Sequence, residues 1–195
     1  NALAVCQPST AASYFHLLRQ HAYVNHHRPV VIATPKSMLR NKQAASMPHE
    51  FTSGRWEPAL DDPSITDPSK VETLLLCTGK LRWELDAYRE KHGINGRFAI
   101  ISLERLYPLP GRALSEILAR YPHVEDIRFI QDEPANQGPW TFLAAHLPNS
   151  VRMHSDIDLK MTRVARGWAS APAVGSHEVH VQQSADLLTR AFKTR

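Results

Sequence analysis

The sequence has 195 residues, of which 43% are hydrophobic and 22% are charged, and its net charge is +4 at pH 7. This composition is typical of a globular protein that can bury a sizeable core in one or two domains. No run of about 18 apolar residues occurs, so we expect no membrane span. Lysine and arginine are scattered among acidic residues rather than gathered in one tract, which argues against nucleic-acid binding.

The two cysteines, Cys6 and Cys77, lack the spacing of a disulfide framework or a metal site. Cys77 ends the apolar run LLLC and is predicted to be a small buried side chain. Isolated cysteines suit a reducing compartment, so we expect a cytoplasmic protein. The first ten residues have neither the basic nor the apolar region of a signal peptide. They also lack an initiator methionine, and we therefore expect a fragment or a processed product.

The first third of the chain predicts a helix over 9–23 and a short β-branched strand over 29–34. Either Ser9 or Thr10 supplies the N-cap of the helix. Its apolar face is predicted to consist of Phe15, Leu18 and Ala22. A helix and a strand without a partner strand cannot form a domain, so both are predicted to be the tail of a larger one. Residues 41–69 contain four prolines and no sustained period, which predicts a surface linker, packed through its aromatic residues.

From residue 70 onward, strand and helix patterns alternate. Strands are predicted at 71–77, 98–103, 126–131 and 161–166. Helices are predicted at 81–93, from Pro110 to about Tyr121, from Trp140 to about Leu147, and after Ser176. This alternation predicts an α/β fold with a mostly parallel sheet between two layers of helices, a three-layer sandwich.

Ligands of open α/β sheets bind beyond the carboxyl ends of the strands. Here those ends are CTGK (77–80), SLER (102–105) and QDEP (131–134). The charged side chains that they would bring together are Lys80, Glu104, Arg105, Asp132 and Glu133. This set could hold an anion or a polar partner. The alternative is a surface ion-pair network among Lys80, Glu104 and Asp132.

Two motifs that suggest ligands do not have the required spacing. HEVH at 177–180 places two histidines three residues apart, whereas zinc proteases need HExxH, and a pair of solvated histidines is the better interpretation. TGK at 78–80 lacks the upstream glycine and the following serine or threonine of a Walker motif. Spacing alone therefore identifies no catalytic group.

Taken together, the segments resemble the C-terminal end of the thiamine-diphosphate-dependent 2-oxoglutarate dehydrogenase family, most of all its multifunctional decarboxylase form. The resemblance covers almost the whole chain in order. Its most specific parts are RPVVIATPKSMLRNK (28–42) and QDEPANQGPW (131–140). The other matching parts are QPSTAASYFHLLRQ (7–20), TGK (78–80), LERLYPLP (103–110), RYP (120–122) and SAP..GSHEVH (170–180).

The resemblance implies an architecture. Residues 1–42 would end a pyrimidine-binding domain, 43–69 would be a linker, and 70–195 would form a transketolase-type C-terminal domain. The loop QDEPANQGPW would connect a strand to a helix at the carboxyl edge of the sheet, with Pro134 ending the strand and Trp140 anchoring the helix in the core. Its implied role is to shape a domain or subunit contact rather than to make bonds.

The resemblance also implies cofactors and partners. Thiamine diphosphate and Mg²⁺ would bind outside this segment, because the family's GDG…NN stretch is absent from the chain. No catalytic or cofactor-binding residue is therefore expected here, and the fragment alone should be inactive. The parent would be a homodimer that decarboxylates 2-oxoglutarate and passes succinyl to lipoamide in the tricarboxylic acid cycle. Its partners would be a lipoyl-bearing acyltransferase and dihydrolipoamide dehydrogenase.

Some members of the family are activated by acetyl-CoA at the C-terminal domain. The positions that match this allosteric site are Gln20, Arg55, Arg105 and Arg112. Gln20, where arginine is expected, and Ala113, where a second arginine would follow Arg112, depart from the pattern. The resemblance further suggests that Arg55 and Arg112 approach each other, although plain surface arginines are the alternative. For the whole chain, the alternative function is a free-standing nucleotide- or CoA-binding α/β module.

Overall fold

The computed structural model describes residues 2–25 and 27–194. Within these ranges a five-stranded sheet has the order β3 (Ala59–Leu60), β5 (Phe98–Leu103), β4 (Thr73–Cys77), β7 (Asp126–Pro134) and β8 (Thr162–Arg166). The last four strands are parallel, and β3 runs antiparallel to β5. The predicted mostly parallel α/β sheet is confirmed, and each of its four main predicted strands is present. The resemblance to a transketolase-type domain stays a prediction.

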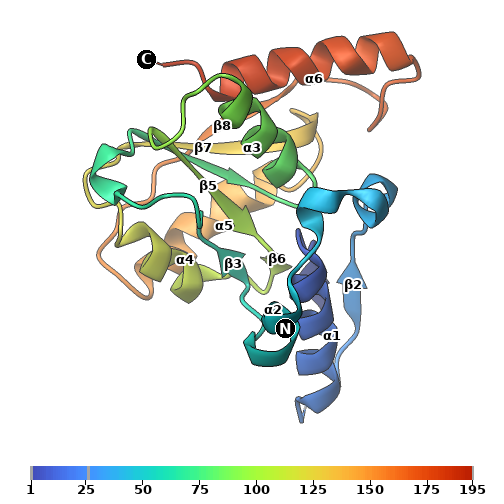
Figure 1. The fold of residues 1–195 in the computed structure, drawn as a ribbon, viewed down its shortest axis with the longest axis vertical. Coiled ribbons are helices and arrows are strands. Elements are labelled where there is room, and N and C mark those ends of the chain that lie inside the picture. Colours follow the sequence, from blue (N-terminus) through green and yellow to red (C-terminus); the bar gives the residue numbers. More distant parts are fainter. Residues whose placement is uncertain (1, 26, 195) are drawn as a thin grey trace.

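Helices cover both faces of this sheet (Figure 1). One face carries α4 (Gly111–Leu118) and α5 (Trp140–Arg152), and the other carries α3 (Leu81–Lys91) and α6 (His177–Ala191). The central strand β4 is buried along its whole length. Its Leu74 and Leu76 belong to the core under α4 and α5, whereas Leu75 and Cys77 belong to the core under α3. This alternation is why the run LLLC is apolar without interruption.

A second, smaller sheet joins the first residues of the chain to the rest. β1 (Ala4–Cys6) pairs in parallel with β2 (Val30–Ile32) and antiparallel with β6 (Arg105–Tyr107). The expectation that the first helix and strand lack a partner strand is therefore wrong. Both missed strands, β1 and β6, have three residues each, which is too short for a readable hydrophobic period.

The helix α1 (Ala11–Tyr23) turns a different face inward from the predicted one. Thr10 is its N-cap residue, as expected, because its hydroxyl accepts a hydrogen bond from the Ser13 amide. However, Phe15 and Leu18 are 43% and 47% exposed. The buried side is formed by Ala12, Ser13, His16 and Leu17. It packs against Cys6 and Trp56 and a buried carboxylate, and these tertiary contacts decide which face is covered.

The predicted linker is a packed part of the structure. It contains α2 (Pro48–Ser53) and β3. Short 3₁₀ helices lie at its two ends, at Lys42–Ala44 and Pro68–Lys70, and a further one, Lys36–Arg40, precedes it. Trp56 is buried, and Phe51 makes an edge-to-face contact with Phe15. β3 extends the large sheet at one edge. The proposed domain boundaries stay a prediction, but the linker is not a bare connection.

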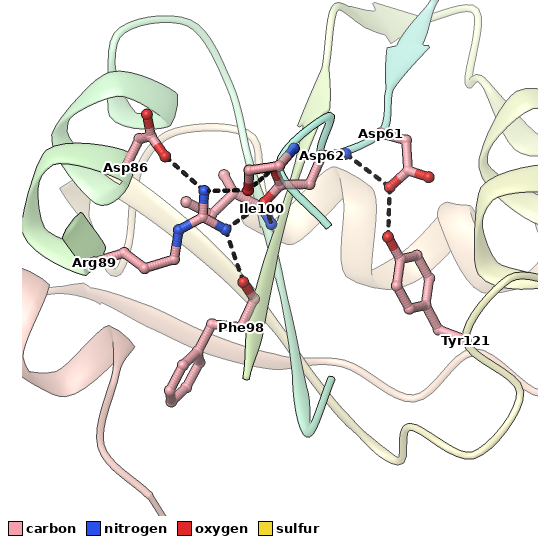
Figure 2. A network of polar contacts seen from close by, with 8 residues as sticks. Asp61, Asp62, Asp86, Arg89, Phe98, Ile100 and Tyr121 are labelled. Carbon is pink, nitrogen blue, oxygen red and sulfur yellow. Dashed lines mark hydrogen bonds and ion pairs between the residues drawn. The ribbon is translucent and has the colours of Figure 1, made fainter. Parts of the chain in front are cut away.

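A buried ion pair joins this segment to α3 (Figure 2). The Arg89 and Asp62 side chains are each 3% exposed. The guanidinium of Arg89 also donates to the carbonyl oxygen of Phe98 at 2.8 Å and to the carboxylate of Asp86 at 2.6 Å. The carboxylate of Asp62 in turn accepts from the amide of Ile100 at 2.8 Å. The network therefore connects the linker, α3 and β5 at one place.

Asp62 is held in its charged form. Burial by itself would raise its pKa, but the hydrogen bonds and the charge of Arg89 outweigh this effect, with help from Ile100 and Ser64. The pKa of Asp62 is therefore below its usual value of 3.8. The neighbouring Asp61 accepts a hydrogen bond from the Tyr121 hydroxyl at 2.9 Å, which ties the same turn to the end of α4 (Figure 2).

Glu104 holds the N-terminus of α1 against the end of β5. It is fully buried, and its carboxylate accepts from the Ser9 amide at 2.8 Å and the Ser9 hydroxyl at 2.6 Å. The hydroxyls of Ser13 and Ser102 also donate to this carboxylate, at 2.5 and 2.6 Å. Trp83 of α3 donates from its indole nitrogen to the Ser9 carbonyl oxygen at 2.7 Å. These hydrogen bonds offset the free-energy cost of removing the Glu104 carboxylate from water. They also connect the small sheet to the large one.

The substitution Asp62→Asn should lower the free energy of unfolding by up to about 3–5 kcal/mol near neutral pH, because it removes the buried carboxylate that pairs with Arg89 and leaves the partly exposed Asp86 as the remaining counter-ion. The folded-state pKa of Asp62 is depressed, so its contribution is complete above about 3.8 and is lost as the pH falls through the lower folded-state value. Urea unfolding should therefore show a smaller difference between wild type and variant below that pH. The exposed Asp156→Asn is the control. A difference that stays constant with pH would contradict this account.

The substitution Glu104→Ala should release α1 from the sheet, because it leaves buried donors of Ser9, Ser13 and Ser102 without their acceptor. We expect the amides of α1 to exchange with deuterium at least about tenfold faster, while those of β4 keep their protection. Mass spectrometry of exchanged peptides measures both regions. Glu90→Ala, an exposed position on α3, is the matched control. Unchanged protection of α1 would show that Glu104 does not hold it.

Candidate functional site

The carboxyl ends of the parallel strands meet, as the sequence predicts. Lys80, which follows β4, forms ion pairs with Asp132 of β7 at 2.9 Å and with Glu84 of α3 at 2.8 Å. Burial alone would lower the pKa of Lys80, but the two carboxylates outweigh it and raise the pKa. Lys80 is therefore charged and paired at neutral pH. The ion-pair alternative is confirmed for Lys80 and Asp132.

Glu104 does not take part in that ion-pair network, and its predicted place there is wrong. Its carboxylate is turned away from Lys80 toward serine side chains under α1. Glu84 is the second partner of Lys80 instead, because one helical turn brings residues 80 and 84 to the same side of α3. Arg105 donates from Nε to the Pro108 carbonyl oxygen at 2.8 Å, and burial lowers its pKa. The predicted five-residue constellation thus divides into separate contacts.

Gln131 organises the loop QDEPANQGPW. Its side chain is buried, and Nε2 donates to the carbonyl oxygens of Pro134 at 2.9 Å and Gln137 at 2.8 Å. Its Oε1 accepts from the Trp140 amide at 3.1 Å. The strand β7 continues beyond residue 131, the end that the sequence pattern predicts, to Pro134, where the resemblance places its end. Gly138 then has a φ of 71°, which explains why glycine occupies the turn.

The same loop is attached to the chain after β8. Asn136 and Ala169 exchange two hydrogen bonds, at 3.0 and 3.1 Å, and Gln137 donates to the Ala169 carbonyl oxygen at 3.0 Å. Trp140 is half-buried and packs against the core rather than within it, which corrects the expected core position. Its ring stacks on Phe129, with centroids 6.3 Å apart, and Arg163 lies over it. The loop is a structural junction between two strand ends.

Three of the four candidate effector residues gather around Trp56. Gln20 and Arg105 line a cavity of about 210 Å³ between α1, β1 and β6. Gln20 and Arg55 line a neighbouring cavity of about 350 Å³. Trp56 contributes to both. The fourth residue, Arg112, lies in the first turn of α4, is exposed, and lines neither of these two cavities.

Arg55 is an exposed residue of the linker that is sensitive to the charge of α4. A hydrogen bond with Glu57 and the charge of Glu57, and to a lesser extent the charge of Glu116 on α4, raise its pKa. Glu116 is one helical turn beyond Arg112. Arg55 and α4 are therefore close enough to interact electrostatically. The direct approach of Arg55 to Arg112 stays a prediction.

Both cysteines are buried, and burial disfavours the thiolate form that a nucleophile needs. Burial raises the pKa of Cys6 to about 11 and that of Cys77 to about 12. Over residues 2–25 and 27–194, no group of three or more His, Cys, Asp or Glu side chains could hold a metal ion. In the same ranges no helix has the length and apolarity to span a membrane. The carboxyl edge of the large sheet therefore presents the ion pairs of Lys80, the hydrogen-bonded loop QDEPANQGPW and the cavities near Trp56.

Known proteins match the chain closely. The family model "2-oxoglutarate dehydrogenase C-terminal" matches residues 45–192. The chain is 45% identical over 192 residues to the 2-oxoglutarate dehydrogenase E1/E2 component of Corynebacterium glutamicum. It is 42% and 40% identical over 194 residues to the multifunctional 2-oxoglutarate metabolism enzymes of Mycolicibacterium vanbaalenii and Mycobacterium sp. (strain KMS). These alignments cover 97–98% of the chain but 15% of each relative, so the chain spans about one seventh of their length. The chain therefore belongs to the 2-oxoglutarate dehydrogenase C-terminal family.

Proposed function

We propose that this chain is the C-terminal portion of a longer enzyme that decarboxylates 2-oxoglutarate and passes a succinyl group to lipoamide in the tricarboxylic acid cycle. The observation that carries the proposal is the identity of 40–45% along almost the whole chain with relatives named for 2-oxoglutarate metabolism. Thiamine diphosphate and Mg²⁺ would supply the carbanion chemistry from outside this segment. The parent would work in the cytoplasm as a homodimer with the acyltransferase and dihydrolipoamide dehydrogenase components.

The segment itself would serve as a structural and interface element. Exposed apolar side chains are frequent in its first 47 residues, and exposed apolar surface marks contacts with other protein. They are Phe15, Leu18, Tyr23, Val31, Leu39 and Met47. Those side chains support packing against the rest of the parent. Glu104 and Gln131 would keep the surface and the carboxyl-edge loop in position, since both are buried and hydrogen-bonded.

We further propose that acetyl-CoA acts as an effector near Trp56, through Gln20, Arg55, Arg105 and Arg112. Guanidinium groups pair bidentately with phosphate, and the two cavities that Gln20 lines offer room beside such groups. The free amides in the first turn of α4, beside Arg112, would add to the affinity for an anion. Gln20 supplies no charge, so we expect this effector to bind more weakly than it would with arginine there.

The isolated 195-residue chain should not release carbon dioxide from 2-oxoglutarate, whereas the full-length gene product should do so with thiamine diphosphate and Mg²⁺. The measurement is radioactive carbon dioxide from 2-oxoglutarate labelled at its first carbon. Turnover by the isolated chain would contradict the proposal. An intact mass of 22.0 kDa for the native protein would instead favour a free-standing nucleotide- or CoA-binding module.

Calorimetric titration of the full-length protein with acetyl-CoA tests the effector site. Arg112→Ala should weaken binding at least about tenfold, because a charge-assisted contact contributes roughly 1.5–3 kcal/mol. Gln20→Arg should strengthen it. Arg97→Ala, an exposed arginine paired with Glu72, controls for the loss of one positive charge. Absence of heat from both wild type and Gln20→Arg would refute the effector site and leave these arginines as plain surface.

A further inference from the structure

The small sheet has one face covered by a hydrophobic cluster. β1 and β2 run parallel and are connected by α1, which makes them a βαβ unit. The strand residues on the covered face cluster with Leu17 of α1 and with Trp56. They are Ala4, Cys6, Val30 and Ile32. Parallel strands in proteins are normally covered on both faces, so the opposite face shows whether this unit is complete.

The opposite face carries apolar side chains that the described chain leaves uncovered. Val5 and Val31 are partners in the register of β1 and β2, and the alternation along each strand turns both toward this face. Neither belongs to any of the three hydrophobic clusters of the described residues. Val31 is 53% exposed, whereas β4, another apolar parallel strand, is buried along its whole length. The small sheet is therefore open on this face.

β2 also leaves one hydrogen-bonding edge open. It lies on the outer side of the small sheet, away from the large sheet (Figure 1). The carbonyl oxygen of Pro29 and the amide of Ala33 bond to β1, each at 2.9 Å. Because backbone groups alternate in direction along a strand, the amides of Val30 and Ile32 point away from β1. The run PVVIATP (29–35) contains no charged side chain, although proteins usually protect a free edge with charge.

The rest of the parent enzyme fits this open edge and face better than a second copy of the chain does. A two-fold axis would pair two β2 strands of three residues each, far less than the 20–30 residues a side of a specific interface. Such a pair would also leave the face of Val31 open. In contrast, the chain spans 15% of its relatives, so a parent of similar length has ample chain for a strand and a helix.

We propose that a segment of the parent enzyme outside this chain completes the small sheet. One strand of that segment would pair with the free edge of β2 and accept hydrogen bonds from the amides of Val30 and Ile32. An amphipathic helix of the same segment would cover Val5 and Val31. The inference rests on the proposed function, because it needs a longer parent chain, and it names the surface and the manner by which the parent docks.

Maleimide labelling of the full-length gene product tests whether this face is covered. The thiol of Val31→Cys should react at least about tenfold more slowly than that of Val181→Cys, because labelling then needs local opening. Val181, on α6, is the matched control, since it is also a valine that is 53% exposed in this chain. Mass spectrometry of peptides reads each position separately from other cysteines. Equal labelling rates would overturn the proposal.

Photo-crosslinking of the full-length protein identifies what covers the face. A photoreactive diazirine side chain replaces Val31, and mass spectrometry identifies the cross-linked peptides. Cross-links to residues of the parent outside this chain support the proposal. Cross-links between position 31 of two copies would show a second copy instead, and they would overturn it, as would the absence of any cross-link.

Hydrogen exchange of the full-length wild type tests the edge without a substitution. The amides of Val30 and Ile32 should exchange at least about a hundredfold more slowly than in an unstructured peptide. Exchange at the unstructured rate would refute the added strand. The carbon dioxide assay keeps the two proposals apart: an active full-length enzyme with an unprotected β2 refutes the sheet extension alone. A native protein of 22.0 kDa would refute the proposed function, and the occupant with it.

Discussion

A carboxylate that is buried away from water needs hydrogen-bond donors in place of water. The described donors to Glu104 are serines from two distant parts of the chain. Ser9 and Ser13 belong to the start of α1, and Ser102 belongs to β5. The small sheet can therefore form only when the N-terminal segment sits on the end of β5. The cavities beside α1 follow from this placement, because α1 supplies a wall of each.

The ion pair of Arg89 and Asp62 likewise holds two distant segments of the chain together, here the linker and α3. It holds the segment around Asp62 against the edge of the sheet, in addition to the buried apolar side chains of Ala59 and Ile65. A buried pair of this kind is weak as a source of stability but costly to break. Its value to the fold is positional, since it helps to place β3 beside β5 and Trp56 where α1 can pack against it.

The chemistry of the chain is consistent with a supporting role in a larger enzyme. Lys80 and Asp132 are paired at the carboxyl edge, burial raises the pKa of both thiols, and Gln131 holds the loop after β7 in place through hydrogen bonds. Among the described residues, His16, Arg82 and Arg89 each have a buried side-chain nitrogen without a hydrogen-bond partner.

Sequence patterns determined the main elements of the large sheet. Continuous apolar runs such as LLLC mark strands that are buried on both faces, and the periodic segments between them mark helices, so the α/β alternation was predictable. The family was also predictable, because long specific segments such as QDEPANQGPW carry far more information than short motifs.

Tertiary structure alone decided the rest. The inward face of α1, the strands β1 and β6, and the fate of Glu104 depend on contacts between residues about a hundred positions apart. No local period encodes such contacts. Pairing of charges is likewise decided in space, since Lys80 meets Asp132 and Glu84, whereas Nη1 of Arg82, two residues later, has no hydrogen-bond partner among the described residues. The sequence thus determined the chemical type of each side chain. The fold determined its partners, because burial and distance decide which charged groups form ion pairs or hydrogen bonds.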